Sequence, residues 1–262
     1  MYMIIHEVKR CYKSFLIWAL ATGGCLVIFM LIYPEFGKMS SAVTDMYAQL
    51  GAFSDAFGLN RVNLNTPLGF YGVEGGTMLS LGGGMFAAML AAGMLAKEEG
   101  GHTAEFLFAA ARYRSRVVAA KLAAVLLLIT LFALFCFGCG ALSFVIIGES
   151  VDWGQLALLH AAQWIMCMEI GVICFGVSAF LCKSSVGIGI GIAILLYFMN
   201  LFINMSEKLE VLKYVTPFYY GDASRVLTDE AIAQGAAVGG WILGIVVVIA
   251  GFGYYMRKDL AA

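Results

Sequence analysis

The chain has 262 residues, of which 62% are hydrophobic and 13% are charged, with a net charge of -1 and a mean hydropathy of +0.90. So large an apolar fraction exceeds what a water-soluble core can bury, and the composition therefore predicts an integral membrane protein. The near-zero net charge, with basic residues scattered along the chain, excludes the basic surface that a nucleic-acid partner requires.

Six apolar stretches are long enough to cross a bilayer as helices, which takes about 20 residues each. They are residues 15–33, 78–96, 117–147, 156–181, 186–205 and 238–256. The predicted fold class is thus an all-α membrane protein, with a single transmembrane domain over residues 1–262. The first stretch is too long for a signal peptide and no small-residue cleavage site follows it, so we expect it to be retained.

The distribution of lysine and arginine predicts that both termini lie in the cytoplasm, because cytoplasmic segments are enriched in these residues. This orientation places 11 of the 16 basic residues inside and 5 outside. Those expected outside are Lys38, Arg61, Lys208, Lys213 and Arg225. Those expected inside are Lys9, Arg10, Lys13, Lys97, Arg112, Arg114, Arg116, Lys121, Lys183, Arg257 and Lys258.

Residues 1–14 have a helical period that separates an apolar face from a basic face. Ile4, Val8 and Tyr12 share the apolar face, whereas Lys9 and Lys13 share the basic one. This pattern predicts an amphipathic helix that lies in the membrane interface, followed by a sharp bend into the first span. A plain cytosolic extension of the span is the alternative, because basic flanks are common.

Two segments between spans are expected on the outer side. Residues 34–75 carry apolar side chains at helical spacing from Val43 to Phe57, which predicts an amphipathic outer helix. Residues 206–235 have a helical pattern that is interrupted at Pro217, and their aromatic side chains suit a membrane interface. We therefore expect short outer helices before the last span.

A charged segment, residues 97–116, separates the second span from the third. Glu98, Glu99 and Glu105 stand beside Phe106 and Leu107, and a run of arginines follows. A short helix with one acidic flank and one apolar face could bind in the groove of a partner protein. The alternative is an ordinary basic loop on the cytoplasmic side.

This segment resembles the cytoplasmic loop between the second and third spans of type-2 ATP-binding-cassette (ABC) transporter permeases. In that family an acidic, Gly/Thr, Glu, Leu-Leu run precedes a Pro-x-Ser-Arg turn and a downstream Lys. The matching residues are Glu98, Glu99, Gly101, Thr103, Glu105, Phe106, Leu107, Arg114 and Lys121. The chain departs at Ala111 and Tyr113, where the family usually has Pro and Ser. The order of surface helix, six spans and outer segment extends the resemblance over nearly the whole chain.

The resemblance implies the permease subunit of an exporter in a bacterial cytoplasmic membrane, with an amphipathic substrate such as a peptide, an antibiotic or a lipid-like molecule. It also implies a coupling helix that binds a separate cytosolic ATPase dimer, which would hold ATP and magnesium. The coupling residues would be Glu98, Glu99, Gly101, Thr103, Glu105, Phe106 and Leu107. A second permease, identical or paralogous, and membrane lipid would be the other partners.

The chain itself is expected to be no enzyme and to bind no cofactor or metal. It lacks the Gly-x-x-x-x-Gly-Lys-Ser/Thr phosphate loop. An intramembrane protease is disfavoured, because Ala179 interrupts the Gly-x-Ser-Gly pattern and Thr103 interrupts Glu-Glu-x-x-x-Arg. Cys136 and Cys139 have a metal-ligand spacing, but no Asp, Glu or His lies near them in sequence to complete a site, so we expect them to pack as apolar groups.

Four polar residues inside spans are candidate cavity or substrate contacts: Gln163, Glu169, Asn200 and Asn204. A bare carboxylate at the bilayer centre costs about 2.5 to 3.5 kcal/mol on insertion scales, so Glu169 should be protonated, paired or facing a wet cavity. Hydrogen bonds between helices are the alternative role for all four.

Two other functions stay open. Glu169 would suit a proton-coupled secondary transporter, although repeated halves are not evident in the sequence. An ATP-driven immunity or sensor complex that extracts a compound from the membrane would share every feature above.

Overall fold

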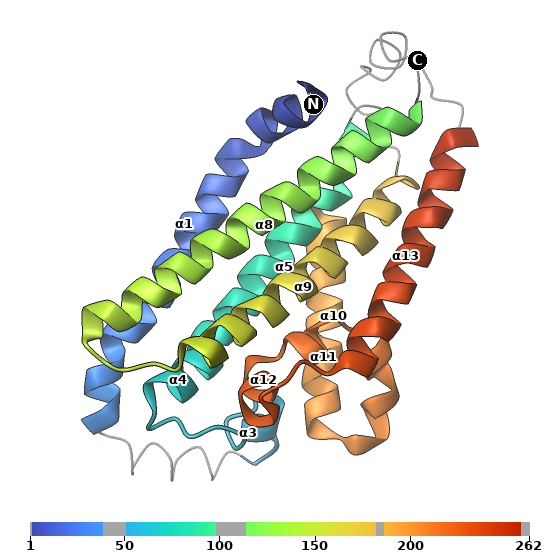
Figure 1. The fold of residues 1–262 in the computed structure, drawn as a ribbon. Helices are drawn as coiled ribbons and strands as arrows, with labels where there is room; N and C mark the ends of the chain where they lie inside the picture. Colours follow the sequence, from blue (N-terminus) through green and yellow to red (C-terminus); the bar gives the residue numbers. More distant parts are fainter. Residues whose placement is uncertain (1, 39–50, 98–113, 182–185, 258–262) are drawn as a thin grey trace.

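The computed structural model describes residues 2–38, 51–97, 114–181 and 186–257. Within these ranges the chain is all helical, and six helices are long and apolar enough to cross a membrane (Figure 1). They are α1 (Tyr2–Lys38), the run from α4 (Pro67–Phe70) through η1 (Tyr71–Gly75) to α5 (Gly76–Ala92), α8 (Arg114–Ile147), α9 (Trp153–Ser178), α10 (Val186–Met205) and α13 (Gln234–Arg257). The predicted all-α membrane fold is confirmed.

Four short helices lie at the end of the bundle opposite the two termini (Figure 1). They are α3 (Ala52–Ala56), the 3-10 helix η2 (Glu207–Tyr214), α11 (Phe218–Gly221) and α12 (Ala223–Asp229). The short helices expected in 206–235 are therefore present. Asp222 caps the start of α12, because its side chain accepts hydrogen bonds from the backbone N–H groups of Ser224 and Arg225.

The helices α5 and α9 form the centre of the bundle. In their most apolar windows 67% and 61% of residues are buried, compared with 22% in α13. The helix α1 packs along α8, whereas α5 packs on α9 and α10, and α13 packs on α9. The outer faces of α1, α8, α10 and α13 are thus left for lipid.

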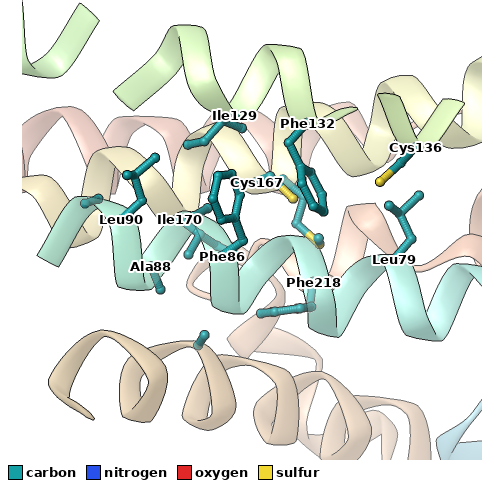
Figure 2. Close-up of a cluster of buried hydrophobic side chains, with 14 of the residues drawn as sticks. Leu79, Phe86, Ala88, Leu90, Ile129, Phe132, Cys136, Cys167, Ile170 and Phe218 are labelled. Atoms are coloured by element: carbon teal, nitrogen blue, oxygen red, sulfur yellow. The ribbon is translucent and has the colours of Figure 1, made fainter. Parts of the chain in front are cut away.

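Aromatic and aliphatic side chains fill the space between α5, α8 and α9 (Figure 2). Phe86 of α5 stacks on Phe132 of α8 with ring centroids 4.9 Å apart. On its other side α5 approaches α10 so closely that a Cβ at Gly189 would lie 2.6 Å from the carbonyl oxygen of Ala88. Gly189 therefore permits backbone contact between these two helices.

The amino-terminal region differs from the prediction. The sharp bend expected after residue 14 is absent, since Tyr2–Lys38 is one continuous α-helix. The reason is a tertiary contact. Glu7, inside the basic segment, is buried against α8 and the end of the second membrane helix rather than exposed to head groups.

The second membrane helix begins earlier than predicted, at Pro67 instead of residue 78, so that residues 67–75 are not part of the outer segment. Thr66 caps this helix by accepting a hydrogen bond from the backbone N–H of Gly69, and Pro67 occupies its first turn. The amphipathic outer helix predicted within 34–75 falls largely in residues 39–50, outside the described ranges.

Candidate functional site

The predicted coupling residues lie outside the part of the chain that the structure describes. They are Glu98, Glu99, Gly101, Thr103, Glu105, Phe106 and Leu107. Both flanks of this segment are described. Lys97 lies in a helical turn that follows α5, and Arg114 begins α8. The structure therefore shows the contacts of the residues on either side of the segment.

One carboxylate on α1 joins those two flanks. Glu7 Oε1 accepts a hydrogen bond from Nζ of Lys121 on α8 at 2.7 Å, and Glu7 Oε2 accepts one from Nζ of Lys97. Glu7 is 4% exposed and Lys121 is 1% exposed. We call these three residues the Glu7 cluster. Because the charges are buried, removal of one partner is expected to cost about 3 to 5 kcal/mol.

Within the Glu7 cluster, the charge of Lys97 depends on the carboxylate. Burial lowers the pKa of Lys97 from its ordinary value, and the positive charge of Lys121 lowers it further. The hydrogen bond and charge of Glu7 act in the opposite direction. Glu7 therefore favours the charged form of Lys97 at a position where burial opposes it.

Sequence reasoning identified Lys121 but missed Glu7. The available signal was that Glu7 is the single acidic residue before Glu35, in a segment otherwise rich in lysine and arginine. Its partners stand 90 and 114 positions away, so the sequence pattern of residues 1–14 does not reveal them.

The candidates Gln163 and Glu169 are buried within the helix bundle. Glu169 on α9 is 0% exposed, and its Oε2 accepts a 2.6 Å hydrogen bond from the hydroxyl of Tyr220 on α11. Burial raises the pKa of Tyr220 above its ordinary value, and the neighbouring Glu169 raises it further, so this hydroxyl stays a donor. Gln163 donates to the carbonyl of Gly221 at 2.6 Å and hydrogen-bonds the hydroxyl of Ser80.

One oxygen of Glu169 is not satisfied. Its Oε1 is buried and has no hydrogen-bond partner within the described ranges. The α13 backbone faces this oxygen at Gly240, where an added Cβ would clash with Oε1. Glu169 thus connects α9 to α11 through Tyr220 and lies close to the backbone of α13. Its predicted role as a substrate contact stays a prediction.

The candidates Asn200 and Asn204 lie one turn apart on α10, at the end of the bundle opposite the termini. Both donate to Oδ2 of Asp222, at 3.2 and 3.0 Å respectively. Asn204 also accepts hydrogen bonds from Arg61 and Arg225, each at 3.1 Å. The four sequence candidates therefore lie in two separate places. Asn200 and Asn204 contact charged side chains that sequence reasoning did not connect with them.

Cys136 and Cys139 are free thiols on α8, and Cys136 is buried in the core near Leu79 (Figure 2). Among the described residues, no group of three or more His, Cys, Asp or Glu side chains could hold a metal ion. The buried Cys136 has the packing environment expected for a small apolar group, whereas Cys139 is only partly buried.

Comparison with known proteins supports the resemblance. A family model described as "ABC-2 family transporter protein" matches residues 14–260, which is nearly the whole chain. No curated protein matches the sequence. The matched region includes all six membrane helices except the first turns of α1, and it also includes the predicted coupling segment. The chain therefore belongs to the ABC-2 family of transporter proteins, as a multi-pass membrane subunit.

Proposed function

We propose that this subunit belongs to an exporter, that a separate cytosolic ATPase supplies the energy, and that residues 98–113 bind that ATPase. The observation that supports the proposal is the Glu7 cluster. It fastens both flanks of this segment to α1, so that a force applied to the segment would reach three membrane helices together.

The packing suggests how such a force would spread. The helix α1 lies along α8, and only a short turn separates Lys97 from the end of α5, so these three helices would move as one unit. The helix α5 also packs on α9 and α10, which would carry the movement toward Asp222 and the short helices at the far end. A second permease subunit would complete the path for an amphipathic substrate such as a peptide, an antibiotic or a lipid-like molecule.

The direct test is affinity purification of the tagged full-length chain from its native membrane. An ABC ATPase and a second permease are expected to copurify. Glu105→Lys is expected to abolish copurification of the ATPase or to leave ATP hydrolysis without transport. The matched control is Glu149→Lys, which reverses an exposed charge in the turn between α8 and α9. Absence of any ATPase from the wild-type preparation would refute the proposal.

Orientation gives an independent test. Thr103→Cys is expected to react with a membrane-impermeant maleimide only from the cytosolic side, whereas Glu149→Cys is expected to react only from the other side. Labelling of Cys at position 103 from outside intact cells would show that this position is not cytosolic. A cytosolic ATPase could then not bind residues 98–113, and the proposal would be refuted.

A proton-coupled secondary transporter is the second candidate, favoured by the unsatisfied buried oxygen of Glu169. Transport that persists without ATP, collapses with the proton gradient and is lost in Glu169→Gln would favour it over the exporter.

A further inference from the structure

A cavity of about 500 Å³ opens at the end of the bundle opposite the termini, beside the carboxyl end of α10. Its wall includes Arg61, Asn204, Tyr219 and Arg225, together with the apolar side chains of Ile203 and Met205. Cavities of roughly 300 to 1,000 Å³ are the size that binds small ligands. This one combines two cations with an apolar edge.

The two arginines converge on a single acceptor. Arg61 Nη2 and Arg225 Nη2 each donate to Oδ1 of Asn204 at 3.1 Å. The orientation of this amide is set by its other end, because Nδ2 donates to the carbonyl of Ala56 at 3.0 Å and to Asp222 at 3.0 Å. Both of those partners can only accept, so the amide oxygen must face the two guanidinium groups.

Neither guanidinium has a carboxylate partner within the described part of the chain. Asp222, which shares Asn204 with both arginines, accepts at Oδ1 from Ser224 and the backbone of Arg225, and at Oδ2 from Asn200 and Asn204. Its oxygens are thus occupied by neutral donors. Burial, and then the neighbouring Arg225 charge, lower the pKa of Arg61 from its ordinary value.

Each arginine also has a buried nitrogen that makes no hydrogen bond to the described residues. Arg61 Nη1 and Arg225 Nε are buried and have no hydrogen-bond partner among the described residues. Arg225 is held in place by its stacking on the ring of Tyr219, with the guanidinium carbon 3.9 Å from the ring centroid. The one acidic residue of the cavity wall, Glu210, already pairs with Lys213 at 2.7 Å. Buried donors without partners are unfavourable, so this arrangement favours an added acceptor.

We propose that this cavity binds the phosphate group of an amphiphilic ligand between Arg61 and Arg225. Guanidinium groups bind oxyanions through charge-assisted N–H donors. Each of the two arginines has one buried nitrogen without a partner among the described residues. Met205 borders the cavity and continues the exposed apolar face that Leu195, Phe198 and Phe202 form along α10. A phosphate at the arginines would therefore place an attached acyl chain along α10. The proposal does not depend on the function proposed above.

The test uses the purified full-length protein in a neutral detergent and three probes. Short-chain phosphatidylglycerol and phosphatidylcholine of equal chain length carry the phosphate on an amphiphile, and sodium phosphate supplies it free. Binding is measured as the concentration-dependent shift of the midpoint of thermal unfolding, followed by tryptophan fluorescence. The variants are Arg61→Gln and Arg225→Gln. Lys208→Gln is the control, because it removes an exposed charge from η2 at the same end of the molecule.

We expect at least one probe to bind the wild type and Lys208→Gln saturably and with equal affinity. Each arginine variant should weaken the binding about tenfold or more, as loss of a charge-assisted hydrogen bond does. Competition of sodium phosphate with the lipid would identify a general phosphate site, and binding of lipid alone would identify a headgroup site. No saturable binding to the wild type, or equal affinity in the wild type and Arg61→Gln, would overturn the proposal. Should Arg225→Gln fail to fold, Arg61→Gln and Arg225→Lys carry the comparison.

Discussion

Glu7 and Lys121 are 114 positions apart in the chain, and their side chains form a buried ion pair of 2.7 Å. The pair links the amino-terminal helix to the helix that follows the predicted coupling segment. Lys97, which precedes that segment, binds the second oxygen of the same carboxylate. The ends of residues 98–113 are thus joined through α1, and this link can be tested without knowledge of the substrate.

Glu7→Gln should destabilise the protein by about 3 to 5 kcal/mol, because it removes the carboxylate that neutralises the buried ammonium group of Lys121 and the partly buried one of Lys97. The measurement is thermal or denaturant unfolding of the detergent-solubilised chain. Glu149→Gln, which neutralises an exposed carboxylate, should change stability by about 0.5 kcal/mol or less.

A double-mutant cycle makes this prediction specific. In the Glu7→Gln background, Lys97→Met should destabilise less than it does in the wild type, because the ion pair is already lost. Additive effects of the two substitutions would show that Glu7 and Lys97 stabilise the protein independently of each other.

Tyr220→Phe should destabilise by about 1 to 3 kcal/mol, because it removes a buried donor from Glu169 Oε2 while Oε1 already lacks a partner in the described ranges. The effect should shrink when Glu169 is first changed to Leu, since no buried carboxylate is then left unpaired. Tyr12→Phe, which alters an exposed tyrosine on α1, is the control. Equal stability losses for Tyr220→Phe in both backgrounds would contradict this account.

Hydropathy was sufficient to predict the six membrane helices, because bilayer thickness sets a minimum length that few other segments reach. It did not show where the second helix begins. The stretch from Pro67 to Gly75 contains Glu74 and three glycines, which have the composition of a loop, and it becomes helical through the Thr66 cap and tertiary packing. Local composition is a weak guide where tertiary contacts decide the conformation.

Prediction of the candidate polar residues from the sequence was limited in a similar way. Polarity inside a span correctly selected residues that make inter-helix hydrogen bonds, as Gln163 and Asn204 do. It could not show that Asn204 would meet Arg61, which stands 143 positions away in a segment without a distinctive pattern. The cavity residues Tyr219 of α11 and Arg225 of α12 were missed for the same reason, because they lie beside Asn204 only in the folded chain.

Asp222→Ala should destabilise more than Asp152→Ala does. Each aspartate caps a helix, and loss of such a cap typically costs about 0.5 to 2 kcal/mol. Asp222 in addition accepts from Asn200 and Asn204, so its loss leaves two amide groups on α10 without this acceptor. Comparison of the unfolding midpoints of the two variants therefore isolates the contribution of the asparagine contacts, and equal losses would assign Asp222 to capping alone.

Gly189→Ala should destabilise the bundle by about 1 to 3 kcal/mol, the range for overpacked cores. The added methyl would lie 2.6 Å from the carbonyl oxygen of Ala88, and backbone cannot move aside as a flexible side chain can. Gly191→Ala, two residues further along α10, is a matched control because nothing lies within 4 Å of its Cβ position. Alanine favours helix more than glycine does by about 1 kcal/mol, so Gly191→Ala should leave stability unchanged or raise it. Opposite signs for these two neighbouring substitutions would establish direct backbone contact between α5 and α10, whereas equal effects would mean that the two helices are further apart than the structure has them.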